Sequence, residues 1–146
     1  MESMKVYETT SVEETCALAG KLGSKAVSGQ VYLLSGDLGT GKTAFAQGFA
    51  SGLGIDDYVN SPTFTIMQIY EGGRLPLYHF DVYRIGDSSE MDELGYEEYF
   101  YGNGVTLIEW PEMIEDILPA DAICISIEKN LEKGFDYRKI TIKEGS

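Results

Sequence analysis

One stretch of eight residues constrains the fold of this chain more than any other. Residues 36–43 read GDLGTGKT and match the phosphate-binding pattern G-x-x-x-x-G-K-[ST] at every fixed position. The apolar, partly β-branched run at residues 30–35 predicts a buried strand before it, and Phe45, Phe49 and Leu53 recur at helical spacing after it. A strand, a glycine loop and a helix in this order direct backbone N–H groups and the positive end of a helix dipole at one point. Phosphate oxygens are the ligands that fit there.

The individual residues of this loop suit a nucleoside triphosphate with Mg²⁺. Its glycines allow a close approach of the backbone that a Cβ atom would prevent. Lys42 can reach the terminal phosphates, and Thr43 can offer its hydroxyl to Mg²⁺. We therefore predict these nucleotide contacts in the loop: Asp37, Leu38, Gly39, Thr40, Gly41, Lys42 and Thr43.

Length and charge limit the remaining possibilities. The chain has 146 residues, which predicts a single domain over residues 1–146 with little material for a separate substrate domain. Its 24 acidic and 11 basic residues give a net charge of −13, so we do not expect strong, charge-driven binding of tRNA or other nucleic acids. The acidic surface suits a basic protein partner, although it also serves solubility alone.

Cysteine content and hydropathy bear on the cellular location. Cys16 and Cys124 lie far apart, each within an apolar pattern, and we interpret both as reduced core residues. The N-terminus lacks the apolar segment of a secretion signal, and no stretch reaches the length of a membrane span. These features predict a cytoplasmic protein without a membrane association.

Two carboxylates compete for the metal and water chemistry that a triphosphate site needs. Residues 105–109 form a strand that ends in Glu109, the layout of a Walker B segment, and the strand before it ends in Asp81. Acids at the carboxyl ends of such strands lie where open α/β sheets bind ligands. We favour Glu109 as the metal ligand because its strand is central in character, and we leave open which acid activates water. We expect His79 and Trp110, which lie close to these acids in sequence, to be packing residues.

A segment of small hydroxyl residues around a proline precedes these strands. Loops of this kind in phosphate-loop proteins contact the γ-phosphate and change with nucleotide state, so Thr63 is our candidate for a switch contact. A proline-anchored turn into the next strand explains the same residues equally well.

The flanking segments predict how the sheet is completed. A short strand over residues 5–9 leads to Ser11, which with Glu14 has the spacing of a capping box at the start of a helix. Thr10 or Ser11 could lie beside a bound base, although helix capping alone accounts for Ser11. A hairpin turn at residues 71–74, short helices after Asp87 and Pro111, and two terminal strands follow. The fold class we predict is a three-layer α/β phosphate-loop domain with a mainly parallel central sheet extended by antiparallel strands.

Four motifs together resemble one family. These are GDLGTGKT at 36–43, NSPTFT at 60–65, HFDVYR at 79–84 and IEWPE at 108–112, and in this order they closely resemble the bacterial TsaE family. The resemblance implies a weak ATPase of tRNA threonylcarbamoyladenosine biosynthesis that acts with TsaD and TsaB on adenosine 37 of tRNAs reading codons that begin with A. It implies that ATP and Mg²⁺ bind at Lys42, Thr43 and Glu109, that Thr63 and Asp81 lie in the catalytic region, and that Thr10 and Arg138 contact the nucleotide.

Other classes of protein share a phosphate loop. A small-molecule kinase would need an arginine-bearing lid, which three arginines and the short length argue against. A GTPase would need an Asn-Lys-x-Asp segment to recognise guanine, and the sequence contains none. A nucleotide-dependent interaction module, in which hydrolysis is incidental, would have the same residues and stays open.

Overall fold

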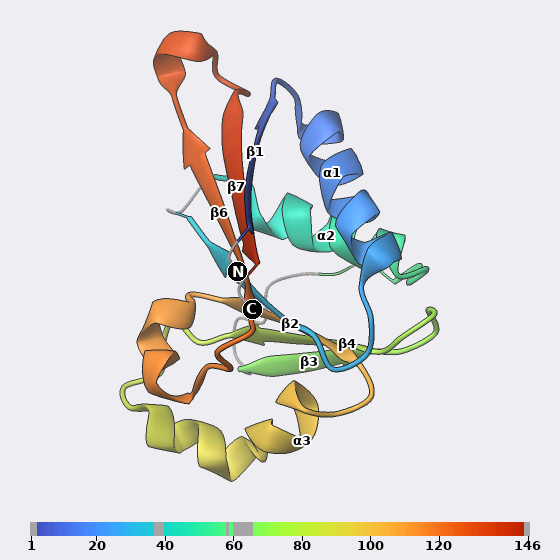
Figure 1. The fold of residues 1–146 in the computed structure, drawn as a ribbon, viewed down its shortest axis with the longest axis vertical. Coiled ribbons are helices and arrows are strands. Elements are labelled where there is room, and N and C mark those ends of the chain that lie inside the picture. Colours follow the sequence, from blue (N-terminus) through green and yellow to red (C-terminus); the bar gives the residue numbers. More distant parts are fainter. Residues whose placement is uncertain (1–2, 37–39, 58, 60–65, 145–146) are drawn as a thin grey trace.

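A computed structural model describes residues 3–36, 40–57, 59 and 66–144 (Figure 1). Seven strands of this part form one sheet in the order β1-β7-β6-β2-β5-β4-β3. Their bounds are β1 Ser3–Thr9, β2 Val31–Ser35, β3 Met67–Tyr70, β4 Leu77–Asp81, β5 Val105–Glu109, β6 Ile123–Lys129 and β7 Arg138–Glu144. Strands β6, β2, β5 and β4 are parallel, whereas β7, β1 and β3 add antiparallel pairings at the two edges. The predicted mixed sheet with a parallel core is confirmed.

Helices cover the sheet on both faces and make the three predicted layers. Helices α1 (Val12–Lys25) and α2 (Lys42–Gly52) pack together on one face, where Phe45 and Phe49 lie in a fully buried apolar cluster. Helix α3 (Tyr96–Phe100) and the 3₁₀ helices η1 (Ser88–Leu94) and η2 (Pro111–Ile117) cover the other face of β2, β5 and β4. A further 3₁₀ helix, η3 (Leu131–Lys133), lies between β6 and β7.

Most of the predicted element boundaries are close to those observed, and the differences are local. The helices predicted after Asp87 and Pro111 are present, but each is a tighter 3₁₀ helix. In the predicted capping box, Ser11 accepts a hydrogen bond from the Glu14 N–H, while the Glu14 carboxylate binds the N–H of Thr10 instead of that of Ser11. The second hydrogen bond of the capping box is thus donated by Thr10, one residue earlier than predicted.

The prediction of two core cysteines is wrong for Cys124. Cys16 is partly buried and donates to the Ala44 carbonyl, whereas Cys124 is exposed on β6. Alternation along β6 buries Ile123 and Ile125 on the α1 and α2 face and turns Cys124 to the opposite face. Among the residues that the structure describes, no helix has both the length and the apolar character needed to cross a bilayer.

Candidate functional site

The phosphate loop leaves the central strand β2 and enters α2, as the sequence predicts. Gly36 follows β2, and an added Cβ there would lie 2.9 Å from the Ile127 carbonyl oxygen, so the backbone at Gly36 lies close to β6. Gly41 has a φ of 100°, in the left-handed region that favours glycine, and α2 begins at the next residue. The start of a helix is the place where backbone N–H groups bind an anion. Asp37, Leu38 and Gly39 lie outside the described residues.

Lys42 and Thr43 occupy the first turn of α2 with different exposure. Lys42 is buried, and its ammonium lies 3.5 Å from the centroid of the Trp110 ring. Trp110 has a φ of 62°, the one positive φ among the described residues other than glycine, and its ring also packs on Tyr83 at a centroid distance of 4.7 Å. Thr43 is exposed at the same helix end. The strained backbone at Trp110 holds the indole under the lysine of the phosphate loop.

The two predicted carboxylates meet beside this lysine. Strands β4 and β5 pair in parallel with Asp81 directly opposite Glu109, at the carboxyl ends of both strands. Strand β5 lies between β2 and β4 and is buried along its whole length, so the prediction of a central strand for Glu109 is confirmed. Register therefore puts both acids at the edge of the sheet where the phosphate loop begins.

The environments of the two acids differ. Glu109 is 2% exposed and accepts a hydrogen bond from His79 Nε2 at 2.7 Å. Asp81 is half-buried and accepts a hydrogen bond from the N–H of Tyr83 at 3.1 Å. Burial raises the pKa of Asp81, and the nearby Glu109 charge raises it further, while the Tyr83 N–H and the charge of Lys42 oppose this. Glu109 is thus buried against His79, and Asp81 is the more accessible of the pair.

The side-chain oxygens near the phosphate loop suit a Mg²⁺ ion that is shared with a triphosphate better than a metal ion that is bound by protein ligands alone. Within the described ranges, no group of three or more histidine, cysteine, aspartate and glutamate side chains could hold a metal ion. Mg²⁺ is commonly held by one or two carboxylates together with phosphates and water. The Thr43 hydroxyl and the Glu109 carboxylate are oxygen donors of that kind, and their binding of Mg²⁺ stays a prediction.

Arg138 reaches the phosphate loop from the far end of the chain. Its Nε donates to the Thr40 carbonyl at 2.7 Å, and its Nη1 donates to the carbonyls of Phe135 and Tyr137. Thr10 is directed elsewhere, since its N–H and its hydroxyl both donate to Glu14. The structure therefore brings Arg138 to the loop, and a nucleotide contact of Thr10 stays a prediction. Thr63 lies outside the described residues.

Two residues that we interpreted as packing residues also contact candidate site residues. His79 is completely buried but bonds to Glu109, and Trp110 lies under Lys42. For His79 the sequence does contain a signal. His79 and Asp81 are two residues apart on one strand, so their side chains share a face of the sheet. No local pattern identifies Trp110, since its partner lies far away in sequence.

The fold and this site define a phosphate-loop nucleotide-binding protein. Residues 9–140 match the family model described as threonylcarbamoyl adenosine biosynthesis protein TsaE. A tRNA threonylcarbamoyladenosine biosynthesis protein TsaE of Bacillus subtilis is 50% identical over 141 residues, which are 97% of this chain and 85% of the relative. Its counterpart in Treponema pallidum is 41% identical over 117 residues, covering 80% of this chain and 86% of the relative.

A solved structure agrees with these sequence matches. The crystal structure of Bacillus subtilis YdiB is 42% identical and superposes with a TM-score of 0.85, covering 100% of this chain and 88% of that one. The chain belongs to the TsaE family of proteins of tRNA threonylcarbamoyladenosine biosynthesis.

Proposed function

We propose that the protein binds ATP with Mg²⁺ and hydrolyses it, slowly alone and faster together with TsaB and TsaD. This activity serves the cytoplasmic threonylcarbamoylation of adenosine 37 in tRNAs that read codons beginning with A. One observation carries the catalytic part of the proposal. Asp81 and Glu109 are register partners at the strand ends, and Asp81 lies within electrostatic reach of the Lys42 ammonium. Phosphoryl transfer needs such carboxylates beside the lysine that holds the phosphates.

Each residue has a distinct role in this proposal. Lys42 and the backbone N–H groups at the start of α2 bind the phosphates, and Arg138 holds the loop through the Thr40 carbonyl. Thr43 and Glu109 would hold Mg²⁺, which would supply charge neutralisation to the bound phosphates. Asp81 orients the attacking water because it is accessible, whereas His79 engages Glu109. Water attacks the γ-phosphorus, the bond from that phosphorus to the bridging oxygen breaks, and ADP and phosphate leave.

The proposed switch involves the segment around Thr63. Release of the γ-phosphate would break the contact between this phosphate and the Thr63 hydroxyl, and it would alter the surface offered to TsaB and TsaD. The net charge of −13 supports the further proposal that the protein contacts its partners and leaves the tRNA to them. A filter-binding assay with the isolated protein tests this, and tight, salt-sensitive tRNA binding would contradict it.

The experiment that tests the proposed function measures ATP turnover of the wild type, Glu109→Gln and Asp81→Asn, each alone and with TsaB and TsaD. Glu115→Gln is the matched control, because it neutralises an exposed acid on η2. We expect turnover to fall by at least about 10²-fold in the two site variants and to stay unchanged in the control. Turnover that is indifferent to both acids and to the partners would contradict the proposal.

Two further measurements separate the alternatives. Nucleotide binding and partner association that persist fully in an inactive Glu109→Gln variant, together with normal tRNA modification, would indicate an interaction module. Transfer of the γ-phosphate from ATP to an added small molecule would indicate a kinase.

A further inference from the structure

Two large apolar side chains lie in water on the connection between β6 and β7. This connection, residues 130–137, is the β6–β7 tip, and it forms one extremity of the molecule (Figure 1). Phe135 is 82% exposed and Leu131 is 71% exposed, the two highest values among the exposed large apolar side chains of the described residues. Apolar side chains that gather on one projecting surface mark sites of protein association.

Hydrogen bonds fix the course of the backbone through the tip. The Asn130 side chain accepts from the Glu132 N–H, and the Gly134 N–H donates to the Leu131 carbonyl. At the base of the tip, the Tyr137 hydroxyl donates to Glu8 on β1 at 2.6 Å. Because these contacts already order the backbone, a partner that binds the tip pays little entropy to order it further.

One guanidinium joins the tip to the phosphate loop. Arg138 donates from Nη1 to the Phe135 carbonyl at 3.0 Å and from Nε to the Thr40 carbonyl at 2.7 Å. Strand β6 runs parallel to β2, so the end of β6 where the tip begins lies at the same edge of the sheet as the start of the phosphate loop. The tip is therefore a part of the surface from which a bound protein could act on the backbone of the phosphate loop.

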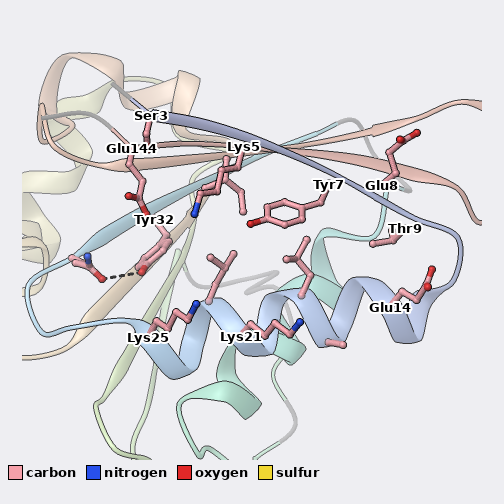
Figure 2. A pocket seen from close by; sticks show the side chains of 15 residues that line it. Ser3, Lys5, Tyr7, Glu8, Thr9, Glu14, Lys21, Lys25, Tyr32 and Glu144 are labelled. Carbon is pink, nitrogen blue, oxygen red and sulfur yellow. Dashed lines mark hydrogen bonds between the residues drawn. The ribbon is translucent and has the colours of Figure 1, made fainter. Parts of the chain in front are cut away.

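The chain itself is a poor match for its own tip. A projecting pair of apolar side chains needs a hollow with an apolar lining. The groove of about 580 Å³ between α1 and β1 has instead three lysines and three glutamates in its lining (Figure 2), namely Lys5, Lys21, Lys25, Glu8, Glu14 and Glu144. The net charge of −13 also opposes the close approach of a second copy or of an anionic membrane surface. A different protein is therefore the occupant that these observations favour.

We propose that the β6–β7 tip docks into an apolar pocket on the TsaB and TsaD partners, with Phe135 as its central anchor and Leu131 beside it. This inference rests on the proposed function, because these partners are the proteins that accelerate ATP turnover there. Exposed aromatic side chains at the centre of an interface commonly contribute most of its binding energy. Arg138 transmits the docking to the phosphate loop, since it bonds to the backbone of both segments.

The test measures the affinity of the full chain for TsaB and TsaD together, with ATP and Mg²⁺ present, by biolayer interferometry. Leu131→Ser/Phe135→Ser removes the two apolar side chains of the tip. Val27→Ser/Tyr101→Ser is the matched control, because it also removes one exposed aliphatic and one exposed aromatic side chain. These two residues precede the amino ends of β2 and β5, at the edge of the sheet opposite the tip. Thermal unfolding verifies that both variants are folded.

We expect the tip variant to bind the partners about tenfold more weakly or worse, and the control to change the affinity by less than about twofold. The inference is overturned if the tip variant binds like the wild type or if both variants weaken binding equally. It is also overturned if sedimentation velocity shows that the tip holds two copies of this chain together.

The same measurement separates this inference from the proposed function. Affinity does not depend on turnover, so a wild type that associates with both partners and does not hydrolyse ATP contradicts the proposed function alone. A stimulated wild-type ATPase whose tip variant keeps full affinity contradicts the docking inference alone. A wild type that does not associate with TsaB and TsaD at micromolar concentration overturns both.

Discussion

His79 Nε2 lies 2.7 Å from Glu109 Oε2, and both side chains are buried. The other ring nitrogen, Nδ1, is also buried and has no hydrogen-bond partner among the residues that the structure describes. A carboxylate only accepts hydrogen bonds, so the ring donates from Nε2. The hydrogen bond from Nε2 therefore positions the Glu109 carboxylate.

The first prediction compares two amides at position 79. In His79→Gln the amide nitrogen can replace Nε2 and keep the bond to Glu109, whereas the shorter side chain in His79→Asn leaves the buried carboxylate without this donor. We expect His79→Asn to lose about 1–3 kcal/mol of unfolding free energy and to need more Mg²⁺ for nucleotide binding, with His79→Gln closer to the wild type. Urea unfolding and Mg²⁺-dependent nucleotide titrations measure the two effects. Equal behaviour of both variants would show that the ring only fills space.

The second prediction concerns the pH dependence of stability at Asp81. Burial, followed by the Glu109 charge, raises the pKa of Asp81 in the folded protein above its ordinary value of 3.8. Asp81 therefore favours the fold most below that value, and its contribution is lost as pH rises through the folded pKa. Asp81→Asn should accordingly have a higher Tm than the wild type at pH 7, with a gain that shrinks toward pH 3.8.

Thermal unfolding across this pH range checks the Asp81 prediction. Asp56→Asn, at an exposed position, controls for the change in net charge. If the two variants gain equally at neutral pH, relief of general charge repulsion explains the result and burial of Asp81 does not.

The third prediction uses Trp110, the single tryptophan of the chain, as a reporter. Because the Lys42 ammonium lies over the indole ring, movement of Lys42 to bound phosphates should change the tryptophan emission. ATP should therefore change the emission of the wild type with the same midpoint as binding measured by calorimetry. An unchanged emission at saturating ATP would show that Lys42 stays on the ring.

The fourth prediction tests the close packing of α1 on α2. A Cβ at Gly52 would lie 2.1 Å from the Gly20 carbonyl oxygen, whereas a Cβ at Gly20 would find its nearest contact 3.6 Å away. Gly52→Ala should cost about 1–3 kcal/mol of unfolding free energy because the helices must separate. Gly20→Ala, inside a helix with room for the methyl group, should be neutral or stabilising by up to about 1 kcal/mol. Chemical denaturation of both variants decides this, and the reverse order would contradict the observed helix contact.

The sequence by itself determined the features that depend on local pattern. The glycine loop, the strand before it and the helix after it are all readable within residues 30–53, because backbone geometry and residue spacing specify them locally. The hairpin and the positions of Asp81 and Glu109 at strand ends were predictable for the same reason. Composition excluded a strongly basic surface without any knowledge of the fold.

Only the tertiary structure decided which side chains meet. The bond between His79 and Glu109 depends on the register of β4 with β5, and Trp110 reaches Lys42 through a left-handed backbone at the end of a strand. A groove lies between α1 and β1 because α1 packs mainly on α2 and makes little contact with β1. Such contacts join residues far apart in sequence, and strand register and helix packing are set by the whole core, so no local pattern encodes them.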